Sequence, residues 1–262
     1  MAIFKKLNVA IIEESIKSLV KTENLSILEK NLQLIPKGID LVVLPELFST
    51  GNIISGNNDI ISIAEKNTDE TILHLKRLAK EHNIAIVGSF IARTSNKIYN
   101  RAFFIENSGE EYFYDKKHFD SNITQNPFSE GNKLSPIIRF RGWNIMLGIS
   151  DDLRYPVWLR NVKNKYDLLI IVANWGKSKN YEWNHLLVAR AIENQCYVCG
   201  SNALIDDNGD ILNNSKFLDY TGRIITEITD SKIIYATLEN DKLEDFRKER
   251  MGSYNFDEFI LK

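Results

Sequence analysis

Short apolar runs alternate with segments of helical periodicity in the first third of the chain. Residues 7–12, 41–44 and 84–91 are nearly continuous apolar runs, which are typical of strands buried on both faces. Between these runs, residues 21–34 and 71–81 carry apolar side chains at helical spacing. The resulting order β-α-β-α-β predicts a layered α/β fold with largely buried strands.

The rest of the chain continues with strand-like runs and two further helical segments. Residues 102–106 and 111–114 flank an Asn-Ser-Gly sequence at hairpin spacing. The polar stretch 119–135 has no clear periodicity, and a loop of this length inside a compact domain is usually functional. The other predicted elements are strands at 137–140, 167–173, 196–201, 215–219, 223–226 and 232–237, and helices at 183–194 and 241–249.

Near the middle of the chain, a strand, a small hydroxyl residue and a helix are predicted in close succession. The apolar run 145–149 reads as a buried strand and ends at Ser150. Tyr-Pro-Val-Trp at 155–158 then predicts the start of a helix, because proline is favoured in a first helical turn. Such an elbow holds a nucleophile clear of the sheet, and the backbone N–H groups behind it can face a developing oxyanion.

The composition is that of a globular protein with a sizeable core. Of its 262 residues, 44% are hydrophobic and 26% are charged, so we expect one α/β domain spanning residues 1–262. The formal net charge of -2 provides no basic stripe for nucleic acid and no polybasic patch for a membrane, which favours small-molecule or protein partners. Apolar runs fall short of the roughly 18 residues that span a bilayer, and the first residues predict a strand rather than a signal peptide.

The two cysteines of the chain, Cys196 and Cys199, both fall in the predicted strand 196–201. Successive strand residues alternate between faces, so two residues three positions apart point in opposite directions. We therefore expect neither a disulfide nor a shared metal, and a reducing cytoplasm is the expected location. The sequence has no metal-ligand spacing and no glycine-rich phosphate loop, so no metal or cofactor is expected.

Three chemically capable side chains lie at the ends of predicted strands. Glu46 follows the apolar run 41–44, Lys116 follows the run 111–114, and Ser150 ends the elbow strand. A carboxylate, an ammonium and a hydroxyl that converge at one place can supply a general base, an oxyanion partner and a nucleophile. Their spacing alone also fits a surface acid, a surface lysine and a turn serine.

Several motifs in register resemble one enzyme family. The chain carries LPE at 44–46, YDKKH at 114–118 and GISDDLRYP at 148–156, in the order found in the nitrilase superfamily, the carbon–nitrogen hydrolases. Further segments resemble the omega-amidase branch of that family, namely DLRYPVW at 152–158, ANW at 173–175, ARAIENQ at 189–195 and DEF at 257–259. The resemblance extends from the first strand to the last few residues.

This resemblance implies a fold, a reaction and site residues. The implied fold is an α-β-β-α sandwich that pairs into an eight-layer homodimer through helices around the elbow. The implied reaction is hydrolysis of a small amide, for the omega-amidase branch the ω-amide of a short 2-oxo dicarboxylic acid. In this family pattern Glu46 is the general base, Lys116 stabilises the oxyanion and position 150 holds the nucleophile. The residues expected to contact the substrate are Asp151, Asn174, Trp175 and Gln125.

The chain departs from the family pattern at three positions. Ser150 stands where the family has a cysteine, and a serine hydroxyl is a much weaker acid than a thiol, whose pKa is about 8.5. The family usually has a second glutamate after the lysine motif, where this chain offers Gln125, or Glu130 in a shifted alignment. Asp151 replaces a typical aromatic residue, and an acid there opposes oxyanion formation unless it points away or is protonated.

These departures leave three interpretations of Ser150 open. In the first, the serine was introduced in place of a cysteine. In the second, Ser150 is the nucleophile of a natural serine hydrolase that uses Asp151 or His118 as its base. In the third, the protein is a pseudoenzyme that binds a small carboxylate or amide. A fourth possibility is a protein that acts mainly through its helical dimer face. The expected function is an omega-amidase-like carbon–nitrogen hydrolase, impaired by the serine, with a catalytically inactive binding protein as the alternative.

Overall fold

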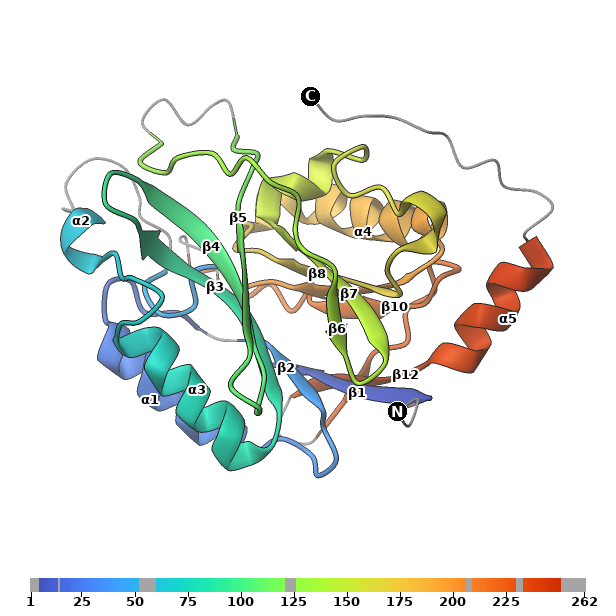
Figure 1. The fold of residues 1–262 in the computed structure, drawn as a ribbon, viewed down its shortest axis with the longest axis horizontal. Helices are drawn as coiled ribbons and strands as arrows, with labels where there is room; N and C mark the ends of the chain where they lie inside the picture. Colours follow the sequence, from blue (N-terminus) through green and yellow to red (C-terminus); the bar gives the residue numbers. More distant parts are fainter. Residues whose placement is uncertain are drawn as a thin grey trace.

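Two β-sheets lie face to face in the computed structural model, and helices cover their outer faces (Figure 1). The structure describes residues 5–13, 15–51, 60–120, 126–205, 209–229 and 233–250. The layers follow the order helix, sheet, sheet, helix, which confirms the predicted α/β sandwich.

Within the described residues, seven strands form the first sheet, in the order β11-β12-β1-β2-β3-β4-β5. β1, β2 and β3 are parallel to one another, whereas β12, β4 and β5 join by antiparallel pairing. The bounds of these strands are β1 Lys6–Ile11, β2 Leu41–Val43, β3 Ala85–Arg93, β4 Ile98–Ile105, β5 Glu111–Asp115, β11 Glu227–Ile228 and β12 Ile234–Glu239.

Five strands of the described chain form the second sheet, in the order β10-β9-β8-β7-β6. β7, β8 and β9 are parallel, and the antiparallel strands β6 and β10 close the two edges. The bounds are β6 Ile138–Phe140, β7 Trp143–Ile149, β8 Leu168–Val172, β9 Tyr197–Ser201 and β10 Lys216–Leu218.

The apolar strands are buried on both faces because each sheet packs against the other sheet and against helices. In β1, Leu7 and Val9 belong to the core between the sheets, whereas Ala10 faces the helical layer. In β8, Ile170 lies in the core between the sheets and Leu169 lies in the core under a helix. The period of two along each strand therefore divides its apolar residues between two cores.

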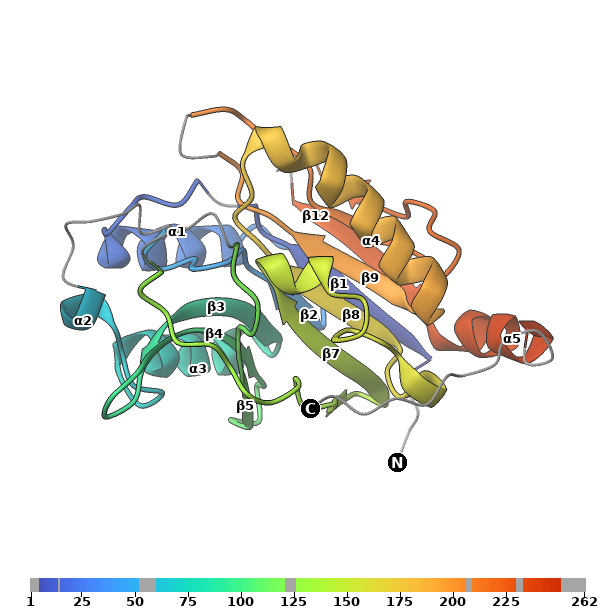
Figure 2. The same ribbon diagram turned by 90° about the horizontal axis from the view of Figure 1, so that it is seen from above.

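Helices cover the outer face of each sheet. In Figure 1, α1 and α3 lie together beside the first sheet, and in Figure 2 α4 runs along the strands of the second sheet. Trp183, Leu187 and Ala191 are spaced by four along α4 and are buried against the second sheet, and Gln195 ends the helix at a left-handed φ of 47°. The helices are α1 Lys21–Leu32, α2 Ile60–Ile63, α3 Glu70–His82, α4 Asn180–Asn194 and α5 Asn240–Arg250.

The structure corrects the predicted helix at the elbow. Residues 156–159 form turns, and a 3-10 helix (η1 Ser150–Arg154) occupies the segment directly after β7. Tyr155 has φ -110° and ψ 88°, outside the helical region, as expected for a residue that precedes a proline. Pro156 therefore follows a short helix that has already ended instead of opening a longer one.

Two smaller predictions also need correction. The predicted strand at 223–226 contributes only a single bridge between Leu218 and Ile224, and the strand that pairs with β12 is β11, farther along the chain. The helix α2 was not predicted, because its four residues are too short for a periodic pattern. The DEF segment at 257–259 lies outside the described residues.

The two cysteines face different cores, as expected from strand alternation. Both are free and buried. Cys199 lies in the core between the sheets, whereas Cys196 belongs to the core beneath α4. Among the described residues, no helix is both long and apolar enough to cross a membrane.

Gly131 fixes the end of the long polar segment against β5. Its N–H donates to the Lys116 carbonyl at 2.8 Å, and an added Cβ would lie 2.1 Å from the Asp115 carbonyl oxygen. We predict that Gly131→Ala lowers the free energy of unfolding by about 1–3 kcal/mol, because backbone atoms must separate. Urea unfolding measures this loss, with Asn132→Ala at an exposed neighbouring position as control. Equal stability of the two variants would contradict the prediction.

Candidate active site

Chain segments from both sheets bring polar side chains to one end of the sandwich. Glu46 follows β2, Lys116 follows β5, Ser150 follows β7, and Asn174 and Trp175 follow β8. β2 and β5 run in the same direction in the first sheet, and β7 and β8 are parallel in the second. The ends of these strands therefore meet at one edge of each sheet, where open α/β sheets place ligand sites.

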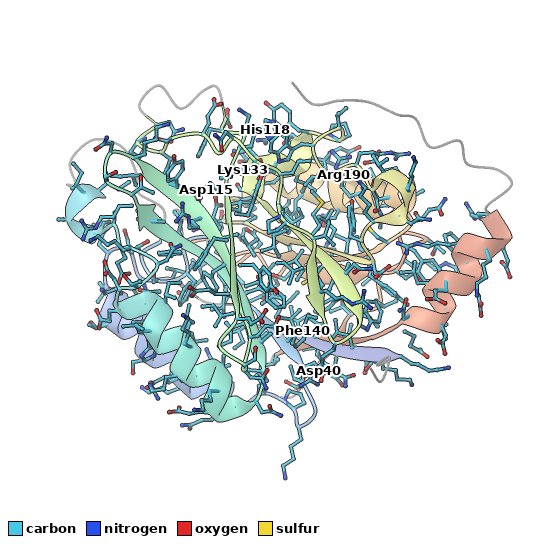
Figure 3. The ribbon with its side chains drawn as sticks, in the orientation of Figure 1. Asp40, Asp115, His118, Lys133, Phe140 and Arg190 are labelled. Carbon is cyan, nitrogen blue, oxygen red and sulfur yellow. The ribbon has the colours of Figure 1, made fainter. Side chains whose placement is uncertain are left out.

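Figure 3 locates this end of the molecule. His118, two residues after Lys116, lies at one end of the sandwich, whereas Asp40 and Phe140 lie at the opposite end. Asp40 directly precedes β2 and Glu46 follows it, so β2 runs from the second end towards the first. The residues that follow β2 and β5 are thus carried to the same end.

The Glu46 carboxylate is buried and held by three donors. Its Oε1 accepts hydrogen bonds from Asn100 Nδ2 at 2.7 Å and from Lys116 Nζ at 3.1 Å, and its Oε2 accepts one from the Asn174 backbone N–H at 3.0 Å. The next residue, Leu47, has a left-handed φ of 52°, and its N–H donates to Ser89 Oγ at 2.9 Å. Both the backbone and the carboxylate of Glu46 are therefore fixed in orientation.

Lys116 lies between two carboxylates. Its Nζ is 3.1 Å from Glu46 Oε1 and 3.1 Å from Asp151 Oδ2, and the side chain is buried. Burial alone disfavours the ammonium, but the charges of Glu46, Asp151 and Asp152 outweigh it and raise the pKa of Lys116 above its ordinary value. An ammonium has three protons, and within the described residues two of them are directed at carboxylates, which leaves the third to donate to another oxygen.

Ser150 begins η1 with a left-handed backbone. Its φ is 49°, a conformation that non-glycine residues rarely adopt, and only 3% of the residue is exposed. The hydroxyl Oγ accepts a hydrogen bond from Trp175 Nε1 at 2.8 Å, which is the one side-chain hydrogen bond to Ser150 within the described parts of the chain. The indole ring packs edge-on against Trp183, with centroids 5.6 Å apart. Trp175 thus joins the serine to the core beneath α4.

Asp151 is part of an alternating chain of charges. One carboxylate oxygen pairs with Lys116 and the other pairs with Arg154, which also forms two hydrogen bonds to Glu182, at 2.5 and 2.8 Å. The Arg154 guanidinium lies 4.5 Å from the centroid of the Trp175 ring. The acid points towards Lys116, and its charge is balanced by two cations.

Asp152 joins the elbow to the lysine segment, a role that the sequence did not reveal. Its fully buried carboxylate accepts from the backbone N–H groups of Ile149, Lys117 and His118 at 3.1, 3.3 and 3.0 Å. It also accepts from the Tyr114 hydroxyl at 2.7 Å and contacts His118 Nδ1 at 2.9 Å. One side chain therefore sets the position of Lys116 relative to Ser150.

Two asparagines near the site also escaped prediction. Asn100 in β4 donates to Glu46, and its backbone carbonyl accepts from the Lys116 N–H at 2.9 Å. Asn202 clamps Trp175, accepting from its backbone N–H at 2.8 Å and donating to its carbonyl at 2.9 Å. A single asparagine after or within a strand has no distinctive spacing, so only the three-dimensional contacts identify these residues.

The other residues considered as candidates have different outcomes. Gln125 lies outside the described residues. Glu130 is exposed and pairs with Lys117 at 2.9 Å, so the shifted alignment does not bring a second acid to Lys116. His118 is held by Asp152 and stacks on Tyr155, with ring centroids 3.6 Å apart. Among the residues that the structure describes, no group of three or more His, Cys, Asp or Glu side chains is arranged to hold a metal ion.

The buried phenol of Tyr114, which donates to Asp152, makes the stability of the fold sensitive to alkaline pH. Burial, followed by the charge and hydrogen bond of Asp152, raises the pKa of Tyr114 well above its ordinary value. The neutral phenol therefore stabilises the fold below the unfolded-state pKa of about 10, and this stability is lost as pH rises towards the folded-state pKa.

We predict that Tyr114→Phe is less stable than the wild type at pH 8 by about 1–3 kcal/mol, because Asp152 and Trp158 each lose a hydrogen-bond partner. The difference should shrink between about pH 10 and 11, since only the wild type loses the phenol contribution. Urea unfolding across this pH range provides the measurement. A difference that stays constant up to pH 11 would contradict the assigned contact.

Comparisons with known proteins identify the family of this chain. The sequence profile of the family described as Carbon-nitrogen hydrolase matches residues 8–248. The chain is 34% identical over 228 residues to the omega-amidase YafV of Escherichia coli, covering 86% of this chain and 87% of that protein. It is 28% identical over 210 residues to the 2-oxoglutaramate amidase of Bacillus subtilis, covering 79% and 80% respectively.

Solved structures show the same arrangement of the two sheets. XC1258 from Xanthomonas campestris, a CN-hydrolase superfamily protein with an arsenic adduct in its active site, superposes with a TM-score of 0.87 at 28% identity, over 98% of this chain and 99% of that one. Nit3 of Saccharomyces cerevisiae, a member of the nitrilase superfamily, gives a TM-score of 0.80 at 23% identity, over 96% of each chain. The fold, the matched profile and the identity to these relatives show that the chain belongs to the carbon–nitrogen hydrolase family.

Proposed function

We propose that this carbon–nitrogen hydrolase cleaves a small linear amide, with Ser150 as nucleophile and the ω-amide of a short 2-oxo dicarboxylic acid as the preferred substrate class. The relatives named for omega-amidase and 2-oxoglutaramate amidase activities support this choice of substrate. The observation that carries the proposal is the buried Lys116 ammonium 3.1 Å from Glu46, beside the elbow that presents Ser150.

In the first half of the reaction, Ser150 Oγ attacks the amide carbonyl carbon and its proton passes to the Glu46 carboxylate. The carbonyl oxygen takes up the negative charge. The uncommitted proton of Lys116 and backbone N–H groups near Ser150 and Asp151 stabilise that oxyanion. The C–N bond then breaks, the nitrogen receives the proton from Glu46, and ammonia leaves.

In the second half, water hydrolyses the acyl ester on Ser150. Glu46 removes a proton from the water, whose oxygen bonds to the acyl carbon, and the proton then passes to Ser150 Oγ as the C–O bond breaks. The product is the free dicarboxylic acid. We propose that Asp151, Asn174 and Gln125 contact the substrate, with Asp151 doing so through its backbone, because its carboxylate is already paired.

The serine makes slow turnover the expected behaviour. A carboxylate is roughly two pKa units less basic than an imidazole, so Glu46 is a weak base for an alcohol. The hydrogen bond to Ser150 Oγ comes from a donor, Trp175, and not from a base. Among the residues that the structure describes, no basic side chain is hydrogen-bonded to Ser150 Oγ, and this supports the alternative function, a non-catalytic protein that binds a small carboxylate or amide on the same scaffold.

We predict that the wild type releases ammonia slowly from a 2-oxo ω-amide and that Ser150→Cys releases it at least about tenfold faster, because a thiolate forms more readily than an alkoxide. Glu46→Gln should abolish release in both forms. Coupled detection of ammonia gives the rates, and intact-mass measurement detects the acyl adduct.

Glu193→Gln serves as the matched control, since Glu193 pairs with Arg190 on α4 away from the site, and this variant should keep the parental rate. If neither nucleophile form releases ammonia or carries an adduct, the hydrolase proposal fails. Stabilisation of the wild type against heat by the uncleaved amide would then favour the binding function.

We further propose that two copies pair through the outer face of α4 and the segment that follows η1. Large apolar side chains are exposed on this surface, including Tyr181 at 76%, Ile192 at 43% and Val157 at 51%. Exposed large apolar side chains on one helix face are typical of subunit interfaces. We also propose that residues 1–262 form one domain and that the protein is cytoplasmic, in keeping with its free, buried cysteines.

We predict that Ile192→Glu converts a dimeric wild type to a monomer, because a buried unpaired carboxylate strongly disfavours the interface. Light scattering after size-exclusion chromatography measures the mass of the 30.2 kDa chain and its assemblies. The matched control is Leu73→Glu, at an exposed position (58%) on α3, which should remain dimeric. A monomeric wild type, or equal behaviour of the two variants, would refute this interface.

A further inference from the structure

The indole N–H of Trp175 is the side-chain donor that touches Ser150 Oγ, at a distance of 2.8 Å. Both residues are 97% buried, with 3% exposed in each case. An indole nitrogen can only donate, so the direction of this hydrogen bond is certain, and the serine oxygen must accept it. The hydroxyl proton is therefore directed elsewhere and remains free to pass to a base.

A donor at this position acts on the charge of the nucleophile. As the hydroxyl proton leaves, negative charge develops on Oγ, and it develops there again when the acyl ester breaks. A hydrogen bond donated to the charged form favours that form. Because both residues are buried and the indole is already in place, this stabilisation needs little reorganisation during the reaction.

The position of the indole is strongly determined by its surroundings. Asn202 holds the Trp175 backbone by two hydrogen bonds, at 2.8 and 2.9 Å, and the ring packs against Trp183 and under the Arg154 guanidinium. The separation of 2.8 Å is that of an N–H···O hydrogen bond. Sulfur accepts more weakly than oxygen, even as a thiolate, because its charge is spread over a larger atom, so the same N–H would do less for a cysteine at this position.

We propose that Trp175 is a catalytic residue that stabilises negative charge on Ser150 Oγ, and that this contact is matched to an oxygen nucleophile. The inference rests on the proposed role of Ser150 as nucleophile. It assigns to the indole N–H a chemical function in place of the substrate contact expected from the sequence. The consequence is that loss of the N–H should impair an oxygen nucleophile far more than a sulfur one.

Covalent labelling tests this without a known substrate. Diisopropyl fluorophosphate reacts as Ser150 Oγ bonds to phosphorus, the P–F bond breaks, fluoride leaves and the hydroxyl proton passes to Glu46. For Ser150→Cys, iodoacetamide alkylates the thiolate sulfur as iodide leaves. Cys196 and Cys199 contribute little background, because both are fully buried and burial raises the pKa of each thiol.

The decisive comparison introduces Trp175→Phe into two backgrounds, the wild type with Ser150 and the Ser150→Cys variant. Intact-mass measurement follows the labelling rate, and peptide mass identifies the labelled residue. Phenylalanine keeps an aromatic ring and removes the N–H. We expect labelling of Ser150 to slow by about 10- to 100-fold, the usual effect of losing a hydrogen bond to a charged group. Alkylation of the Ser150→Cys form should slow by less than about threefold.

Trp143→Phe is the matched control, since Trp143 is also buried but lies at the start of β7, at the far end of that strand from Ser150. This variant should label at the parental rate in both backgrounds. Should Trp175→Phe fail to fold, the indole N–H resonance of Trp175 provides a second measurement. It should move upfield in Ser150→Ala, which removes the acceptor.

The outcomes separate the two proposals. Equal loss in the serine and cysteine backgrounds, or no loss in either, overturns the role of Trp175 while leaving Ser150 as the nucleophile. An unchanged indole resonance in Ser150→Ala also overturns it. Failure of the wild type to label at Ser150 refutes the nucleophile itself, and the inference falls with it.

Discussion

The buried carboxylate of Asp152 is the interaction on which the rest of the site depends. It accepts from the backbone after β5, from the backbone of Ile149 and from Tyr114, so it joins the ends of strands from both sheets. A carboxylate with no exposed surface is costly unless its oxygens are satisfied by donors. The end of β7 and the segment after β5 must therefore lie close together, and this places Lys116 beside the elbow.

Around Lys116 the charges alternate in sign. Glu46 and Asp151 flank the ammonium, and Arg154 balances Asp151 from the other side. Each ion is neutralised by a neighbour, which offsets the cost of removing it from water. The arrangement keeps Lys116 cationic and fixes Glu46 in one orientation. The serine oxygen instead receives a donor, which assists charge on Oγ but does not remove its proton.

Most of the fold could be predicted because its strands are short apolar runs buried on two faces, as in β1 and β8. Helix ends were less certain, since Pro156 fits the first turn of a helix and also the residue after one. The structure places it after η1, where Tyr155 has left the helical region. Likewise, the edge strand β11 consists of two exposed residues, so no burial pattern marks it.

The sequence by itself determined the two-sheet core, the separation of Cys196 from Cys199, and the three candidates Glu46, Lys116 and Ser150. These depend on local periodicity and on motifs, both of which are written along the chain. Only the tertiary structure decided that Asp151 pairs with Lys116 and that the Trp175 indole donates to Ser150. Those contacts join residues 35 and 25 positions apart, and they depend on which way each side chain turns after its strand ends, which no local pattern encodes.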